Sequence, residues 1–459
     1  MSEVVEQLRQ VLPPEALVTD PDRIESYRYD RAMFCPAGMP LAVVLARETA
    51  HVQAAVRIAN ENDVPIVPQG ARSGLSGAAN ALDGCIVISL EKMDRILAIE
   101  PVDRYVVTQP GVYNAVLSRA VGEHGLFYPP DPSSWEFCSI GGNLSTNSGG
   151  LCCVKYGVTT DYVLGLEVVL ADGRVLRTGR KTVKGVAGYD LAKLIVGSEG
   201  TLGIITEATL MLRPAAAKPK TMAALFGSGV EAGNAILEII RSGVSLSLLE
   251  IMDRTTIRAV NKYKRMDLPD EAAAMLIAQS DAGGEAGAAD VAAVAKLCRD
   301  HGALECIEAE DDAEGELLLE GRRAALTALE ELGTTMIDDV AVPRSRLAEF
   351  IGRIEQLSAE LDITIGVLGH AGDGNMHPTV VFDQTDPAQA ERAQVAFDRV
   401  MEIGLELGGT ITGEHGVGVL KRSWLVEEIG PVAIDVHRAI KAALDPKNIL
   451  NPGKVVADQ

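Results

Sequence analysis

Short apolar runs and amphipathic stretches follow one another through the first half of the chain. The apolar runs are rich in Val, Ile and Leu, as buried strands are. They lie at residues 41–45, 64–68, 85–89, 105–108, 164–170 and 202–212. Residues 49–62 space their apolar positions as an amphipathic helix does, with Thr49 in the N-cap position. This pattern predicts a domain of mixed strands and helices.

A stretch of linker composition, residues 212–220, separates this half from the next. Beyond it, apolar runs predict strands at 222–226, 246–251 and 304–309, and helical spacing ends near 240 and 301. Residues 272–279 are too short a run to distinguish strand from helix. The acidic residues 310–316 predict a solvated helix start. Together these elements predict a second, α+β domain with helices on one face of an antiparallel sheet.

The predicted boundaries are residues 1–37 for an N-terminal helical lead-in, 38–216 for the first domain and 217–459 for the second.

The net charge of −22 argues against nucleic acid and anionic membranes as partners. No apolar run approaches the roughly 18 residues that a membrane span needs, and the acidic N-terminus lacks the features of a signal peptide. We therefore expect no membrane insertion and a cytoplasmic location. Seven cysteines without a CxxC pair predict reduced thiols.

Two glycine-rich segments of the first half, 68–77 and 139–150, each follow a strand-like run. Glycine lets backbone N–H groups approach an anion and makes unusual dihedral angles inexpensive. That chemistry suits a diphosphate and the polar edge of a flavin, although turn-rich surface loops would have the same composition. The spacing G-x-G-x-x-G is absent from the chain, so a Rossmann dehydrogenase is not expected.

Two further glycine-rich segments near the C-terminus carry histidines, one with His370 and His377 and one with Glu414 and His415. Both follow apolar, β-branched stretches, which predicts that the polar groups lie on loops at strand ends. His370, His377 and Glu414 form a candidate divalent-metal site with positions left for substrate, and His415 is a candidate base. Hydrogen-bonding loop residues are the alternative, and Asn375 fits either a site or a simple turn.

In this order along the chain, these segments resemble the FAD-linked oxidase family of the vanillyl-alcohol-oxidase superfamily. The likeness implies an α+β fold: a two-subdomain, PCMH-type FAD-binding domain followed by an α+β substrate domain with a helix-covered antiparallel sheet. The C-terminal residues 444–454 match a family ending, so the tail is expected to return to the flavin domain. Some members of the superfamily attach FAD covalently through a histidine in the first glycine segment. This chain has no histidine there, so the resemblance implies FAD bound without a covalent bond.

The resemblance assigns cofactor-binding roles along the first domain and at the tail. The implied residues are Pro68, Gly70, Arg72, Ser73, Gly74, Gly77, Pro130, Asp131, Ile140, Gly141, Gly142, Asn143, Ser148, Gly149, Gly150, Tyr156, Gly157, Asp161, Glu199, Gly200, Gly203, Ile204, Ile205 and Asn451.

The resemblance also implies the activity, which is oxidation of a small D-2-hydroxy acid to the 2-oxo acid. Arg322 and His415 become the catalytic residues, and Asn375 joins them in binding the substrate. His370, His377 and Glu414 become ligands of a divalent metal, with zinc expected before manganese or iron. Leu326 and Ile337 stand where relatives that act on D-2-hydroxyglutarate have Thr and Lys. Glycolate or D-lactate is therefore favoured, with D-2-hydroxyglutarate as the alternative.

Other readings of the same scaffold stay open. Sugar-alcohol oxidation and a non-redox ether-lipid synthesis are different flavin reactions, and a silent flavin subunit of an oxidase complex needs no chemistry at all. The electron acceptor is unknown: a quinone, an electron-transfer flavoprotein, an iron–sulfur subunit and O₂ all fit. No cysteine pattern here would bind an iron–sulfur cluster. A homodimer is also compatible with the sequence.

Overall fold

The structure is a computed structural model that describes residues 3–32, 35–266, 268–269 and 271–456. The chain divides into two compact units. The first comprises Met1–Gly149, Val158–Ala215 and Glu414–Gln459, and the second comprises Gly150–Gly157 and Ala216–Gly413. The linker predicted at 212–220 therefore contains one crossing between the units. A second segment of the second unit, Gly150–Gly157, lies within the residues predicted to form the flavin domain.

The first unit contains a small sheet whose strands run in the order β1-β2-β4-β3. Their bounds are β1 Leu17–Val18, β2 Ala42–Leu45, β3 Ile66–Gln69 and β4 Ile86–Ser89, and β2, β4 and β3 are parallel. Helices α1 (Glu3–Val11) and α3 (Thr49–Glu61) pack on its apolar core. The N-cap prediction for Thr49 is wrong, because Glu48 is the N-cap and the Thr49 hydroxyl donates to Glu167 at 2.7 Å.

An antiparallel sheet in the order β5-β6-β10-β8-β9 forms the rest of the first unit's framework. Its strands are β5 Ile96–Glu100, β6 Tyr105–Thr108, β8 Val163–Val169, β9 Val175–Gly179 and β10 Ile204–Met211. Shorter elements are α2 Pro21–Ile24, α4 Asn114–Gly122, β7 Leu126–Phe127, α7 Leu191–Ile195 and β11 Arg213–Pro214. The predicted hairpin is present, with β8 and β9 joined through a turn at residues 170–174.

The second glycine-rich segment is helical over its first half. Helix α5 spans Ile140–Thr146, with the Ser139 hydroxyl accepting a hydrogen bond from the Gly142 backbone N–H as an N-cap. Asn147 ends the helix in the left-handed conformation. The alternative of a turn-rich surface loop is therefore wrong for residues 140–146, because a capped helix overrides the low helix propensity of two glycines.

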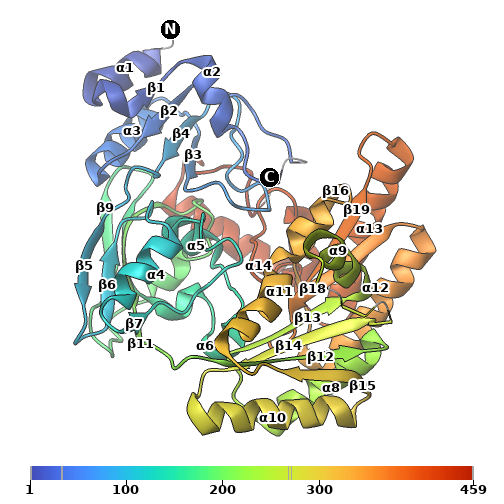
Figure 1. Ribbon diagram of the computed structural model, residues 1–459. Coiled ribbons are helices and arrows are strands. Elements are labelled where there is room, and N and C mark those ends of the chain that lie inside the picture. The colour runs from blue at the N-terminus through green and yellow to red at the C-terminus, as the bar shows by residue number, and fades with distance from the viewer. Residues whose placement is uncertain (1–2, 33–34, 267, 270, 457–459) are drawn as a thin grey trace. The chain divides into compact units, whose positions relative to one another are not determined.

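The second unit is built on one antiparallel sheet, in the order β15-β12-β14-β13-β18-β19-β16 with β17 also pairing β19 (Figure 1). The strands are β12 Lys220–Phe226, β13 Leu248–Asp253, β14 Ala274–Ser280, β15 Ala303–Glu308, β16 Thr334–Ile337, β17 Val340–Ala341, β18 Thr364–His370 and β19 Asn375–Phe382. The run at 272–279 is thus a strand. The short helix α6 (Cys153–Tyr156) contacts β13.

Helices cover both faces of this sheet. Helices α9 (Arg254–Lys264) and α11 (Asp312–Glu330) share an apolar core with one face, while α8 (Gly229–Ser242) and α10 (Gly284–Asp300) lie on the other (Figure 1). Every position of β13 and β14 is buried. The expectation of helices on one face is therefore wrong. The remaining helices of this unit are α12 Leu347–Leu361 and α13 Pro387–Glu406.

The histidine-bearing segment 369–377 is a hairpin. His370 is the last residue of β18 and pairs with Asn375, and His377 lies inside β19, opposite Leu368. Only residues 371–374 form the turn. The prediction that both histidines lie on loops is wrong for His377, because the apolar strand continues through the polar residues. Directly opposed residues share a face of the sheet, so His370, Asn375 and His377 all project to one face.

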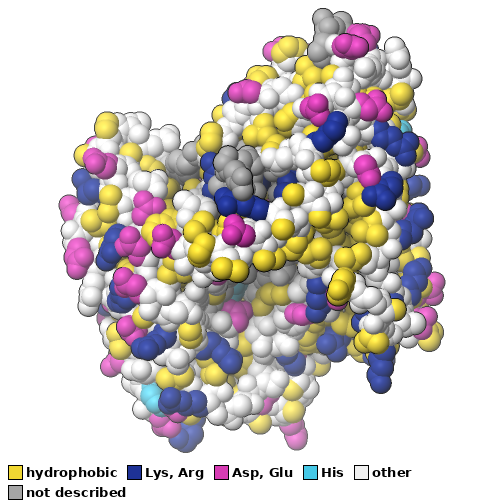
Figure 2. Space-filling model, turned by 180° about the vertical axis from the view of Figure 1, so that it is seen from behind, with side chains coloured by type: hydrophobic (Ala, Val, Ile, Leu, Met, Phe, Trp, Pro, Cys, Tyr) yellow, Lys and Arg dark blue, Asp and Glu magenta, His cyan; other side chains and the backbone are white. Residues whose placement is uncertain are grey.

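Within the described ranges, no helix has the length and apolarity needed to cross a membrane. The surface in Figure 2 carries acidic and basic side chains interspersed with hydrophobic ones. The net charge of −22 is therefore not expressed as a uniformly acidic surface on that face.

Candidate functional site

The two hairpin histidines lie against each other. Their rings meet edge to face, with centroids 5.2 Å apart and an interplanar angle of 85°. Both side chains are buried, at 3% and 4% exposure. A strand pair fixes this arrangement more firmly than a loop could, because each backbone is held by ladder hydrogen bonds on a sheet with strands on both sides.

A carboxylate that the sequence analysis did not single out lies beside His370. Glu250 is on β13, and its Oε1 is 2.7 Å from His370 Nδ1. Its other oxygen, Oε2, accepts a hydrogen bond of 2.7 Å from Arg322 Nε on α11. Glu250 is fully buried and Arg322 is 4% exposed. One carboxylate therefore joins the candidate metal ligand to the candidate substrate arginine.

The neighbouring arginines of α11 have opposite environments. Arg323 is on the exposed side of the helix and pairs with Glu316 at 2.9 Å. Arg322 faces the sheet, and its Nη2 is buried with no hydrogen-bond acceptor among the described residues. A buried guanidinium N–H without an acceptor is costly, so this atom is suited to an anionic ligand.

The segment that leads to Glu414 runs beside β17 and the hairpin. Thr410 and Ala341 exchange backbone hydrogen bonds, and the Thr412 hydroxyl donates to Asp339 Oδ2 at 2.7 Å. A Cβ on Gly413 would lie 2.3 Å from Asn375 Oδ1, so any other residue there would displace the Asn375 side chain. Asn375 is 7% exposed and shares the face of the histidines.

Glu414 and His415 follow Gly413 directly, so covalent geometry keeps them next to this segment. Within the second unit, His377 Nδ1 lies 3.8 Å from Asp339 Oδ1, and the His370 ring lies against the ring of His377. Imidazole nitrogens and carboxylate oxygens suit zinc, manganese or iron. The donor set therefore fits a divalent metal, with Asp339 as a carboxylate that the sequence analysis did not identify.

In the first unit, the first glycine segment presents open donors. Among the described residues, the backbone N–H groups of Arg72, Ser73 and Gly74 donate to no protein group. Arg72 Nη1 is buried and makes no hydrogen bond with these residues, although it lies 3.9 Å from Glu91 Oε2. The Arg72 guanidinium stacks 4.5 Å from the centroid of the Tyr27 ring. Backbone N–H groups beside a positive charge are the donors that a diphosphate needs, so this segment fits the cofactor.

Ser139, which was not among the predicted site residues, joins the two glycine segments. Its hydroxyl accepts hydrogen bonds from the backbone N–H groups of Ala71 at 3.2 Å and Gly142 at 3.3 Å. The N–H groups of Ile140 and Gly141 donate to backbone carbonyls of the 110–112 segment. The first N–H groups of the second segment are thus hydrogen-bonded within the protein. They are not available to an anion, contrary to the expectation that both glycine segments offer backbone N–H groups to a diphosphate.

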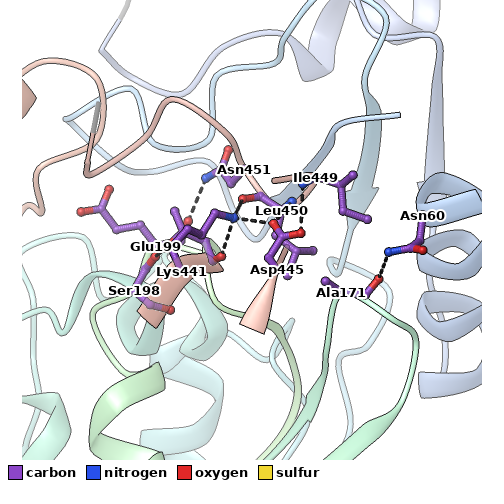
Figure 3. A network of polar contacts seen from close by, with 10 residues as sticks. Asn60, Ala171, Ser198, Glu199, Lys441, Asp445, Ile449, Leu450 and Asn451 are labelled. Carbon is purple, nitrogen blue, oxygen red and sulfur yellow. Dashed lines mark hydrogen bonds and ion pairs between the residues drawn. The ribbon is translucent and has the colours of Figure 1, made fainter. Parts of the chain in front are cut away.

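Glu199 and Asn451 brace the same region (Figure 3). Asn451 Nδ2 donates to the carbonyls of Glu199 and Ala78, at 2.8 and 2.9 Å. The Glu199 carboxylate accepts the backbone N–H groups of Val417 and Gly418, at 2.7 and 2.8 Å. Burial raises the pKa of Glu199 to about 7, against the opposing effect of these two donors. Both residues were predicted to bind cofactor, and these hydrogen bonds are to the protein.

The C-terminal tail is fixed within the first unit. Lys441 on α14 (Arg422–Leu444) donates to the carbonyls of Thr201 and Leu450 and pairs with Asp445 (Figure 3). Lys454 is 3% exposed, and its Nζ donates to the carbonyls of Gly77 and Asn80, both at 2.9 Å. The tail thereby holds the end of the first glycine segment in place.

Other predicted cofactor residues lie beside these contacts or away from them. A Cβ on Gly200 would lie 2.4 Å from Pro68, so the 199–203 segment packs on the first glycine segment. Asp161 accepts the Val158 N–H, and the Pro130 carbonyl accepts from Asn114. Gly150, Tyr156 and Gly157 belong to the second unit, where Tyr156 OH donates to Asp281.

Comparison with known proteins also divides the chain near residue 216, although the second family match includes the tail that belongs to the first unit. Residues 40–179 match the FAD binding domain family, and residues 216–455 match the family described as FAD linked oxidases, C-terminal domain. The glycolate oxidase subunit GlcD of Bacillus subtilis is 42% identical over 456 residues, which is 99% of this chain and 97% of the relative. D-lactate dehydrogenase of Anaerostipes hadrus is 34% identical over 99% of this chain and 97% of the relative.

Solved structures share the fold. p-Cresol methylhydroxylase with substrate bound matches with a TM-score of 0.82 at 20% identity, covering 99% of this chain and 96% of the other. Alkyldihydroxyacetonephosphate synthase matches with a TM-score of 0.78 at 20% identity, covering 98% and 86%. The α+β fold with a PCMH-type flavin domain is therefore confirmed. This chain is a member of the FAD-linked oxidase family, with FAD as its cofactor.

Proposed function

We propose that this protein oxidises a small 2-hydroxy acid, glycolate or D-lactate, to the 2-oxo acid, with FAD and a divalent metal. Relatives that match this chain over nearly its full length are named glycolate oxidase subunit and D-lactate dehydrogenase. The finer claims concern the substrate, the metal and the residue roles, and they rest on side chains of the second unit and on Glu414 and His415 of the first.

The observation that carries the proposal is the buried Arg322. Its Nε is held by Glu250, while its Nη2 has no acceptor among the described residues. A substrate carboxylate would satisfy this atom with a charge-assisted hydrogen bond. Because Glu250 also contacts His370, the bound carboxylate would lie next to the candidate metal ligands.

His370, His377 and Glu414 would hold the metal, which as a Lewis acid lowers the pKa of a bound hydroxyl. His415 would accept the proton of the C2 hydroxyl, since an imidazole needs only a small shift to act near neutral pH. Asn375 would contact the substrate from the same face of the sheet. Arg322 would fix the orientation of C2 through the carboxylate.

FAD, when bound, supplies the two-electron acceptor for the C2 hydride. The residues proposed to hold it without a covalent bond are those of the first glycine segment, led by Gly70, Arg72 and Ser73. The open N–H groups of this segment and the buried Arg72 Nη1 favour a diphosphate there. The remaining cofactor assignments, including Gly149 and Gly157, stay part of this proposal.

The substrate is proposed to be a small monocarboxylate. Leu326 lies one turn after Arg322 on α11, and Ile337 ends β16. Neither side chain can donate a hydrogen bond to a second carboxylate, so a buried second charge would be unpaired at these positions. D-2-hydroxyglutarate is therefore expected to be a poor substrate.

The electron acceptor is proposed to be a partner protein. Relatives from Bacillus subtilis and Escherichia coli are named as subunits, which favours a complex. Among the described residues, no cysteine belongs to a group of three or more side chains that could hold a metal. An iron–sulfur subunit or an electron-transfer flavoprotein fits this proposal better than a relay within the chain.

The substrate assignment is tested by anaerobic mixing of the FAD-loaded protein with single acids. Glycolate, D-lactate, L-lactate and D-2-hydroxyglutarate are added separately, and the visible absorbance of the flavin is followed in time. Rapid bleaching by glycolate or D-lactate, and slow bleaching by the other two, is the expected result. A flavin that none of the four acids reduces would contradict the proposed function.

A further inference from the structure

Glu250 lies in the middle of β13, where the residues on either side of it are apolar and the only other acidic residue is Asp253 at the strand's end. Its neighbours in the strand on the same face, Leu248 and Met252, belong to the core shared with α9 and α11. The side chain is fully buried. An unpaired carboxylate there would cost several kcal/mol, on the order of the stability of a domain. The chain therefore has a carboxylate at a place where an apolar residue would be the ordinary choice.

Each oxygen of this carboxylate has its own partner. Oε1 lies 2.7 Å from His370 Nδ1, and Oε2 accepts from Arg322 Nε at 2.7 Å. The strand register explains the first contact, because the pairing of Ile251 with Gly369 puts Glu250 opposite His370. We propose that Glu250 is a positioning residue that holds the metal-ligating imidazole and the substrate-binding guanidinium in one fixed geometry. This inference rests on the proposed function of both partners.

The contact to His370 sets which ring nitrogen can bind metal. An ionised carboxylate only accepts hydrogen bonds, so His370 Nδ1 must carry the proton. The lone pair of the neutral ring is then on Nε2, which is the nitrogen that could coordinate a metal. Glu250 thereby fixes both the tautomer and the plane of this ligand.

The contact to Arg322 sets the direction of the guanidinium. With Nε held, the planar group has one orientation about its last bond, and Nη2 has no acceptor in the described part of the chain. The same carboxylate compensates the buried positive charge in the absence of substrate. The two functions of the site, metal binding and carboxylate binding, therefore depend on one side chain.

An amide cannot replace this carboxylate. Glutamine has the same shape but offers one acceptor oxygen and one NH₂ donor, whereas His370 Nδ1–H and Arg322 Nε–H are both donors. In Glu250→Gln, one partner must face the NH₂ group. Either His370 shifts its proton to Nε2 and loses its metal-binding lone pair, or Arg322 loses its fixed direction.

The test is calorimetric titration of FAD-loaded, metal-free protein with Zn²⁺ and, separately, with Mn²⁺. For Glu250→Gln we expect metal affinity to fall by about 10- to 100-fold, the range seen when a partner of a metal-bound histidine is removed. We also expect a rise in KM for glycolate. Asp253→Asn is the matched control: it makes the same chemical change on the same strand, at a buried residue that caps α9. Its metal affinity should equal that of the wild type.

Glu250→Asp provides a second variant, which keeps the charge beside Arg322 and so avoids an uncompensated buried cation. The side chain is one methylene shorter, so it cannot make both 2.7 Å contacts. We expect a loss of metal affinity or a rise in KM for glycolate, together with native unfolding behaviour. If neither quantity changes in either variant, Glu250 is not a positioning residue.

The outcomes separate this inference from the proposed function. The proposed function is refuted if the wild-type protein binds neither metal. It is also refuted if neither glycolate nor D-lactate reduces the bound flavin of the wild type. A wild type that binds metal and is reduced, with Glu250→Gln binding metal equally well and with the same KM, refutes only the role of Glu250.

Discussion

Two buried glutamates, one in each unit, hold functional segments by different chemistry. Glu250 contacts side chains, the His370 imidazole and the Arg322 guanidinium. Glu199 contacts the backbone N–H groups of Val417 and Gly418, just after the Glu414–Gly416 motif. The first carboxylate orients reactive groups, and the second fixes the course of a loop. The difference shows that a buried carboxylate can fix the orientation of neighbouring side chains in one place and the path of the backbone in another.

The comparison also separates their electrostatics. Glu250 has a cationic partner within hydrogen-bond distance. Glu199 has neutral backbone donors, and burial raises its pKa to about 7. Loss of a side-chain partner should therefore affect ligand binding and stability most at Glu250, whereas a change of pH should affect stability most at Glu199.

The largest effect is expected from removal of a metal ligand in the second unit. His377→Ala should slow flavin reduction by glycolate about 1,000-fold, because about 4 kcal/mol of Lewis-acid stabilisation is lost. Stopped-flow absorbance of the anaerobic flavin measures this rate. His437→Ala, on an exposed part of α14, should leave it unchanged. A His377→Ala rate close to that of the wild type would exclude the metal from the reaction.

The next effect concerns the ion pair itself. Arg322→Met should destabilise the second unit by about 3–5 kcal/mol, because it leaves the Glu250 charge buried without its cation. Arg323→Met, the adjacent exposed position, should change the unfolding free energy by less than about 0.5 kcal/mol. Urea unfolding followed by circular dichroism measures both. Equal, small effects for the two variants would show that the pair contributes no more than a surface contact.

A pH series tests the Glu199 side of the comparison. Its folded pKa of about 7 lies above the ordinary value of 4.5, so the folded protein keeps a proton that the unfolded chain releases. The free energy of unfolding should therefore fall as pH rises through this window, by about 3 kcal/mol. Glu199→Gln, which cannot titrate, should have a flatter profile in urea unfolding at each pH. Parallel profiles for the two proteins would contradict the assignment.

The smallest expected effect concerns the turn of the histidine hairpin. A Cβ on Gly372 would lie 2.5 Å from Val154 Cγ2, so Gly372→Ala should destabilise the second unit by about 1–3 kcal/mol through overpacking. Val154→Ala in the same chain should restore part of that loss in thermal unfolding. Equal losses in the single and double variants would show that the strain lies elsewhere.

Local pattern predicted much of the fold. Apolar runs located β6 at residues 105–108 and the β8–β9 hairpin, and the acidic stretch before α11 is a helix start capped by Asp311. The pattern could not show that helices cover both faces of the second sheet, because strands buried on both sides and short buried helices have similar runs. It also missed the α5 helix, whose Ser139 cap outweighs its glycines.

The candidate site was less accessible to sequence reasoning. His370 and His377 could be named from their motifs and Arg322 from the family resemblance. Glu250 lies far from them in the chain, and it reaches His370 through strand pairing and Arg322 through a hydrogen bond to α11. The feature of the sequence that could have indicated Glu250 was that it is the single carboxylate within the apolar run at 246–251. Asp339 follows another strand and gave a similar signal. Long-range pairing of this kind cannot be inferred from spacing along one chain.

The most direct test of the metal-assisted mechanism is a single-turnover reduction of the flavin by glycolate or D-lactate before and after metal removal. The protein is treated with a chelator under anaerobic conditions, the bound FAD is quantified, and Zn²⁺ or Mn²⁺ is then added back. We predict that chelation abolishes rapid reduction while FAD stays bound, and that added metal restores it. Undiminished reduction in fully metal-free protein would contradict the account.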